Sequence, residues 1–210
     1  MAAMALFFRE FVRTRRDTGA IAPSGPSLAS ALTRYVVPGS GRPRAVLEVG
    51  PGTGAVTRRV RASMGSLDTL DLAEANPRFA ALLQRTHGRD ARVRLLEGPV
   101  QEHELGAYDT IVCGLPFANF DEGTVEDLFG RLLGALRPGG TLSFFAYAGL
   151  PVLRRTFAGD EERRRARRTQ AVIARTLQRH RFRAETVLGN LPPARVHHLA
   201  AVAPAPAYSG

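Results

Sequence analysis

The chain has 210 residues, of which 44% are hydrophobic. This length suits one α/β domain of ordinary size and is too short for two. Its single cysteine, Cys113, excludes an internal disulfide and a zinc cluster built on cysteines. No apolar run approaches the roughly 20 residues that span a bilayer, and the N-terminus lacks the hydrophobic core of a secretion signal. We therefore expect a cytoplasmic protein.

The formal net charge is +10, and all 29 basic residues are arginines. A charge of this size attracts anionic partners, such as nucleic acid or an acidic membrane surface. A run of charge is often only a solvated face, but near an anionic membrane each arginine could contribute roughly 1 kcal/mol. The densest cluster, within residues 154–168, consists of Arg154, Arg155, Arg163, Arg164, Arg165, Arg167 and Arg168.

Residues 4–16 are predicted to form an amphipathic helix. At about 100° per residue, three phenylalanines fall on one face and arginines fall on the opposite one. This composition is typical of a helix that lies in a membrane interface, although the same helix could pack on the domain core. The residues of this helix that we expect to contact the membrane or its lipid are Phe7, Phe8, Phe11, Arg9 and Arg13, and we expect the same of Arg154 and Arg155 in the arginine cluster.

The chain is organised around residues 46–56, which read V-L-E-V-G-P-G-T-G-A-V. The apolar start predicts a buried strand, the glycines predict a turn, and residues 55–64 can form a helix. The G-x-G-x-G spacing with a preceding acid differs from the G-x-G-x-x-G of dinucleotide binders. It resembles motif I of the class I S-adenosylmethionine-dependent methyltransferases. That resemblance implies that the cofactor contacts Glu48, Gly50, Pro51, Gly52, Thr53 and Gly54.

A second strand is predicted over residues 67–73, and Glu74 follows it directly, 22 residues after Gly52. An acid at this position can accept hydrogen bonds from a ribose diol. The alternative is an acid favoured by the dipole at the start of the next helix, which we expect over residues 78–85 after Pro77. We expect Ala75 beside it to contact the cofactor as well.

The third strand is predicted over residues 92–96, before E-G-P-V-Q-E-H. In many class I methyltransferases an aspartate here binds the adenine amino group. Pro99 stands where that acid is often found, so we expect the backbone of Val100 or the side chain of Gln101 to substitute for it.

The fourth strand is predicted over residues 108–113 and runs into G-L-P-F-A-N-F. This position resembles motif IV of amino-directed methyltransferases, in which N-P-P-Y or a similar sequence orients a base. Gly114 replaces the asparagine, which argues against a nucleobase substrate. The carbonyls of Gly114 and Leu115 could still lie near the transferring methyl group, with Phe117 and Asn119 toward the substrate or membrane.

The remaining pattern predicts helices over residues 28–37, 125–136 and 171–177, and strands over residues 141–147, 183–188 and 194–201. A turn, L-R-P-G-G, is expected before the fifth strand. We divide the chain into an N-terminal helix with a site-covering segment (1–40), a methyltransferase domain (41–202) and a flexible tail (203–210). The covering segment supplies Gly19 and Ser24 as further expected cofactor contacts.

Beyond this core, the chain resembles the bacterial phospholipid N-methyltransferases that associate with membranes. The resemblance rests on T-G-A-I-A-P-S, E-V-G-P-G-T-G, G-L-P-F-x-N-F, F-F-A-Y and N-L-P-P-A-R-V, together with the early F-x-x-F-x-R helix. It implies an α/β, three-layer Rossmann-like fold with seven strands in the order 3-2-1-4-5-7-6, the last antiparallel. It also implies methylation of phosphatidylethanolamine toward phosphatidylcholine. Tyr147 is our candidate for positioning the head group, and the alternative is an ordinary tyrosine of the core or rim.

The resemblance extends to ornithine-lipid N-methyltransferases and rRNA adenine dimethyltransferases, and both activities stay open as alternatives. A non-catalytic membrane-binding module is a further alternative, because the acid after the third strand is missing. We expect S-adenosylmethionine as cofactor, S-adenosylhomocysteine as product, no metal and a monomer. We expect a peripheral protein on the inner face of a bacterial membrane, with nucleic acid the less favoured partner.

Overall fold

The computed structural model describes residues 25–39, 41–147, 159–190 and 193–201. Several predictions therefore lie outside the described residues. They concern the N-terminal helix with Phe7, Phe8, Phe11, Arg9 and Arg13, the covering segment with Gly19 and Ser24, and the arginines Arg154 and Arg155.

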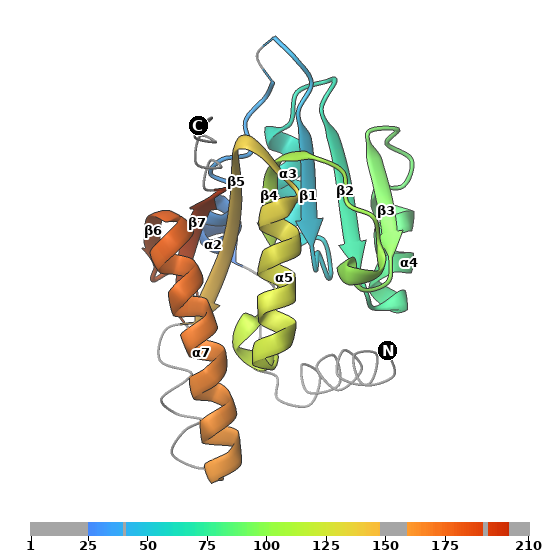
Figure 1. Ribbon diagram of the computed structural model, residues 1–210. Coiled ribbons are helices and arrows are strands. Elements are labelled where there is room, and N and C mark those ends of the chain that lie inside the picture. Colours follow the sequence, from blue (N-terminus) through green and yellow to red (C-terminus); the bar gives the residue numbers. More distant parts are fainter. Residues whose placement is uncertain (1–24, 40, 148–158, 191–192, 202–210) are drawn as a thin grey trace, which may run out of the picture.

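A seven-stranded sheet forms the centre of the molecule (Figure 1), with the strand order β3-β2-β1-β4-β5-β7-β6. Strands β1 to β5 are parallel, and β7 runs antiparallel to both of its neighbours. The predicted fold class and strand order are confirmed. The strands are β1 (Ala45–Val49), β2 (Thr69–Glu74), β3 (Val93–Glu97), β4 (Tyr108–Cys113), β5 (Leu136–Tyr147), β6 (Arg181–Val187) and β7 (Ala194–Ala200).

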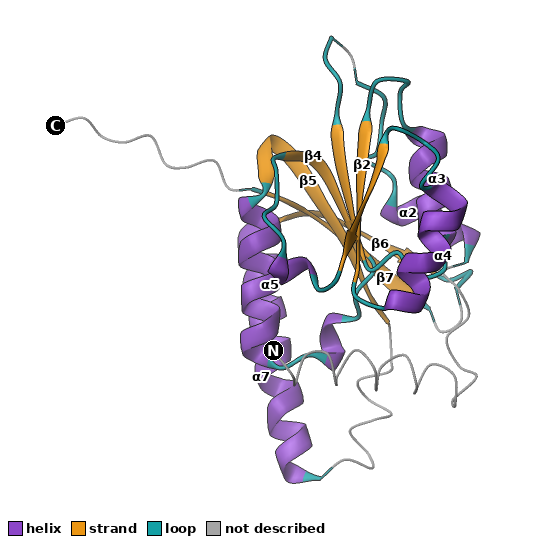
Figure 2. Cartoon of the chain, turned by 90° about the vertical axis from the view of Figure 1, so that its right-hand side faces the viewer, coloured by secondary structure: helices purple, strands orange, loops and turns teal. Residues whose placement is uncertain are grey.

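Helices cover both faces of this sheet, giving three layers (Figure 2). On one face lie α2 (Pro26–Leu32), α3 (Ala55–Ser63) and α4 (Pro77–His87), and on the other lie α5 (Glu122–Gly134) and α7 (Asp160–His180). Two short 3-10 helices, η1 (Val100–Glu102) and η2 (Phe117–Asn119), follow β3 and β4.

The central strand β1 is buried on both sides, as expected for a parallel strand between two helix layers. Leu47 and Val49 belong to the core under α5, whereas Val46 packs with the helices of the opposite face. This explains why the strand reads as a continuous apolar run interrupted only by Glu48.

Local side chains fix where two of the helices begin. The Asn76 side chain accepts hydrogen bonds from the N–H groups of Arg78 and Phe79, with Pro77 in the first turn of α4. Asp121 caps α5 by accepting from the N–H of Thr124. These caps determine where α4 and α5 begin, just after the loops that follow β2 and η2.

Three elements differ from the sequence prediction. The L-R-P-G-G sequence is not a turn, because β5 begins at Leu136 and accommodates Gly139 at φ 75° through a register shift against β4. Helix α7 has 21 residues and includes the arginines from Arg163 onward, since three acids in its first turn favour the helix start. Helix α2 ends at Leu32, and the Tyr35 carbonyl beyond it accepts a hydrogen bond from Thr110 on β4.

A partly exposed polar network attaches the segment after α2 to the edge strand β6. Arg34 donates two hydrogen bonds to Glu185, whose carboxylate also lies 3.0 Å from Nε2 of His198. The other ring nitrogen of His198 lies 2.8 Å from the Ser143 hydroxyl. The Arg34 guanidinium lowers the pKa of Glu185 to about 2, so the ion pair persists at neutral pH.

Candidate functional site

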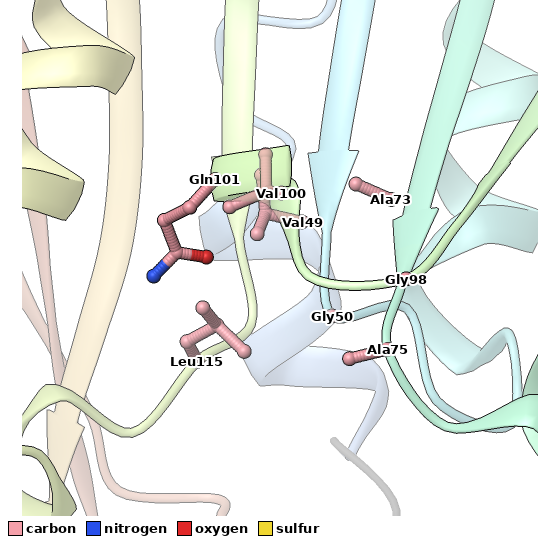
Figure 3. A pocket seen from close by; sticks show the side chains of 8 residues that line it. All are labelled: Val49, Gly50, Ala73, Ala75, Gly98, Val100, Gln101 and Leu115. Atoms are coloured by element: carbon pink, nitrogen blue, oxygen red, sulfur yellow. The ribbon is translucent and has the colours of Figure 1, made fainter. Parts of the chain in front are cut away.

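A pocket opens at the carboxyl edge of the sheet, where β1, β2, β3 and β4 end side by side (Figure 3). Open α/β sheets bind their ligands at this edge. Its lining includes Gly50, Ala75, Val100, Gln101 and Leu115, all of them predicted site residues, and also Val49, Ala73 and Gly98. These last three were not predicted from the sequence, although each lies within one residue of a strand end and that position is a signal that could have identified them.

The glycine turn after β1 adopts a backbone that other residues avoid. Gly50, Gly52 and Gly54 have φ values of 70°, 58° and 77°, all in the left-handed region. The helix that follows packs closely, because a side chain at residue 54 would lie 3.2 Å from Nε2 of His87 on α4. The turn can therefore present its backbone to a ligand without side chains in between.

Glu74, at the end of β2, holds this turn in place. One carboxylate oxygen accepts a hydrogen bond of 2.9 Å from the N–H of Gly52, and the other accepts one of 2.8 Å from the N–H of Asn76. Glu74 is buried and contacts Gly52 of the turn, 22 residues earlier in the chain.

Glu48 is the second buried acid of the site. Its side chain is 2% exposed, and its Oε2 atom has no hydrogen-bond partner among the described residues. Burial, with a smaller contribution from the charge of Glu74, raises the pKa of Glu48 to about 8, and the nearby Thr57 hydroxyl partly offsets the shift. A buried carboxylate of this kind is suited to a cationic ligand group.

Gly114, at the end of β4, lies against the backbone of the glycine turn. A Cβ atom at this position would come within 2.8 Å of the Gly50 carbonyl oxygen and 3.4 Å of that of Val49. The N–H of Gly114 also donates to the Val49 carbonyl. Close packing against the glycine turn therefore requires glycine at position 114, where amino-directed methyltransferases have an asparagine.

The remaining predicted site residues are placed differently. Phe117, expected to face substrate or membrane, is instead buried in the core and stacks on Phe129 at a centroid distance of 4.4 Å. Asn119 is half-buried in η2, two residues further along. Tyr147 is half-buried at the end of β5, with its ring edge-on to Phe145 at 5.0 Å. Pro51 is buried in the glycine turn, and Thr53 is exposed.

Comparison with known proteins agrees with this geometry. Residues 46–140 match the family model described as a methyltransferase domain. An ornithine lipid N-methyltransferase of Singulisphaera acidiphila is 28% identical over 145 residues, which cover 66% of this chain and 74% of that protein. The strand order, the matched methyltransferase domain and this relative together support a class I S-adenosylmethionine-dependent methyltransferase.

Solved methyltransferase structures share the fold of this methyltransferase. The N-methyltransferase NodS from Bradyrhizobium japonicum WM9 superposes with a TM-score of 0.61 at 18% identity, covering 83% of this chain and 94% of that one. An O-methyltransferase from Bacillus cereus, in complex with S-adenosylhomocysteine, also gives 0.61 at 16% identity, with coverages of 92% and 90%. Within the described residues, no helix of the methyltransferase is long and apolar enough to cross a membrane.

The cofactor is S-adenosylmethionine, and the site residues fit it. Its sulfonium and ammonium groups are cationic, which suits the buried Glu48 oxygen that has no partner in the described part of the chain. The bare backbone of the glycine turn and the mostly apolar lining of the pocket suit contact with its nucleoside. Glu74 lies beside the turn, where we predict that it contacts the ribose.

Replacement of Gly114 by alanine should disturb the site without removing any hydrogen-bonding group. The added Cβ collides with backbone, so we expect a loss of about 1–3 kcal/mol in the free energy of unfolding and at least tenfold weaker binding of S-adenosylhomocysteine. Urea unfolding and calorimetry measure the two effects. Gly134→Ala is the matched control, because a Cβ atom there meets no atom of the described residues within 4 Å outside its own helix turn. Wild-type stability and binding in Gly114→Ala would contradict the close packing.

Replacement of Glu48 by glutamine should stabilise the cofactor-free methyltransferase at alkaline pH. The pKa of Glu48 is raised from 4.5 to about 8, so its neutral form is favoured in the folded state. Wild-type stability should therefore fall relative to Glu48→Gln as the pH rises from about 4.5 to about 8, and then level off. Melting temperatures of both proteins across this range test the sign. Parallel curves would show that Glu48 is not desolvated.

Proposed function

We propose that this enzyme is an N-methyltransferase that acts on the primary amine of a membrane lipid. The observation that carries the proposal is the similarity to an ornithine lipid N-methyltransferase over two thirds of the chain. The sequence features that resemble phospholipid N-methyltransferases support the same substrate class. Phosphatidylethanolamine and ornithine lipid both present a primary amine at the membrane surface.

Phosphatidylethanolamine is the acceptor that the sequence resemblance favours, with stepwise methylation toward phosphatidylcholine. Ornithine lipid is a second candidate, favoured by the name of the relative. Head-group preference does not change the chemistry required of the protein, because both acceptors react through a primary amine.

The closed backbone at Gly114 argues against a nucleobase acceptor. Amino-directed nucleic-acid methyltransferases use a side-chain amide at this position to hold the base. In this enzyme such a side chain would begin 2.8 Å from the Gly50 carbonyl oxygen, so the space for it is filled by backbone. An rRNA adenine methyltransferase is therefore the less favoured activity.

The chemistry asks little of the protein beyond alignment and exclusion of water. S-adenosylmethionine supplies a methyl group that is already activated on sulfonium. The lipid amine must be neutral to accept it, so the site has to favour loss of the ammonium proton. We propose that Tyr147, at the carboxyl end of β5, positions the head group, and that the carbonyls of Gly114 and Leu115 face the reacting amine.

Helix α7 supports a membrane-bound mode of action. Its first half extends beyond the ends of the parallel strands, on the side where the pocket opens (Figure 1). Arg164, Arg165, Arg167 and Arg168 are exposed along this half. Arginines beside the site can attract lipid phosphates. We propose that the enzyme works as a peripheral protein on the inner face of a bacterial membrane, with the predicted N-terminal helix as a second contact.

Transfer of labelled methyl groups tests the proposal directly. Purified enzyme with labelled S-adenosylmethionine should label vesicles that contain phosphatidylethanolamine or ornithine lipid, and lipid mass spectrometry should identify the mono-, di- or trimethylated amine. Vesicles of phosphatidylglycerol, which has no amine, and rRNA are the controls. Label in RNA and not in lipid would overturn the proposal, whereas label in neither would favour a non-catalytic membrane module.

The role of α7 is tested by removing charge on it alone. The double variant Arg164→Gln/Arg167→Gln should bind phosphatidylglycerol vesicles about tenfold or more weakly, because each arginine contributes roughly 1 kcal/mol near an anionic surface. Arg85→Gln/Arg89→Gln is the matched control, since these exposed arginines lie at and just beyond the end of α4, toward the opposite edge of the sheet. Equal loss in both variants, measured by co-sedimentation, would mean that only net charge matters.

A further inference from the structure

The pocket at the carboxyl edge has apolar walls and one polar side chain. Among the eight residues that line it, Gln101 is the only one with a side chain that can form hydrogen bonds. The Gln101 side chain extends from η1 past Val100 toward Leu115, as Figure 3 shows. A flat heterocycle between Ala75 and Leu115 would therefore find one amide available to its polar edge.

This amide differs in kind from the acid that often binds adenine in related folds. A carboxylate only accepts hydrogen bonds, so it matches the 6-amino group of adenine and repels a 6-oxo group. No acid is among the described residues that line the pocket, and Pro99 at the start of η1 has no polar side chain. The usual discrimination against a 6-oxo purine is therefore missing from this lining.

A glutamine amide carries one acceptor and two donors, and its terminal torsion is soft. In one orientation its oxygen accepts from the adenine amino group while its nitrogen donates to N1. Turned by half a rotation, its nitrogen donates to the O6 of hypoxanthine while its oxygen accepts from N1–H. Both purines can thus be bound through two hydrogen bonds by the same side chain.

We infer that Gln101 recognises the polar edge of the cofactor's purine, and that the enzyme consequently binds 6-oxo (inosine-type) cofactor analogues nearly as well as adenosine ones. The inference goes beyond the proposed lipid substrate and does not depend on which acceptor is methylated. It concerns the cofactor pocket alone, and binding can be measured without any acceptor.

Calorimetry with S-adenosylhomocysteine and S-inosylhomocysteine tests the inference. The wild-type enzyme should bind the two with affinities within about tenfold of one another. Gln101→Glu, which is nearly isosteric but only accepts, should keep its affinity for S-adenosylhomocysteine and lose at least about tenfold more for the inosine analogue. Gln101→Leu should weaken both ligands by similar factors.

The outcomes separate this inference from the proposed function. Wild-type discrimination well beyond tenfold, or an unchanged ratio in Gln101→Glu with an unaltered melting temperature, would overturn it. Failure of the wild type to bind S-adenosylhomocysteine would overturn both this inference and the cofactor assignment. Absence of lipid methylation with tight binding of both nucleosides would refute only the proposed substrate.

Discussion

The direct contact of bare backbone between the β1 turn and the end of β4 is the constraint on which the site depends. The hydrogen-bond pattern of the sheet continues past the strands here, because Gly50 donates to the Ala73 carbonyl and Gly114 donates to that of Val49. These bonds tie the turn to the strand ends on both of its sides. The result is a rigid edge whose ligand-facing surface is largely peptide, and preorganisation of this kind limits what ordering costs on binding.

Two buried acids complete this edge in different ways. The Glu74 carboxylate accepts hydrogen bonds from backbone N–H groups of the turn and of the start of α4, so both of its oxygens have partners within the fold. Glu48 has an oxygen without a partner among the described residues, and its burial raises its pKa to about 8. Burial of a carboxyl group lowers the stability of the fold, and such groups are typical of sites that bind a cation. The bound cation then compensates for the hydration that the carboxylate has lost.

The arrangement of charge in the rest of the molecule suits a protein that works on a surface. Some arginines form ion pairs at the amino-terminal edge of the sheet, where Arg42 and Arg137 both donate hydrogen bonds to Asp109. The exposed arginines of α7 instead extend past the carboxyl edge, beside the pocket. Cofactor binding and any attraction to an anionic surface are therefore directed to the same side of the protein.

The sequence by itself determined the glycine turn, its link to Glu74 and most of the strands, because these follow from backbone conformation and from apolar runs that are local. With the family resemblance it also determined the strand order. Only the tertiary structure decided that Phe117 belongs to the core, that L-R-P-G-G is part of β5, and that Gln101 is the polar side chain of the pocket. It also showed why residue 114 has to be glycine. Each of these features depends on contacts between segments that are far apart in the chain, and a local sequence pattern does not predict which segments come into contact.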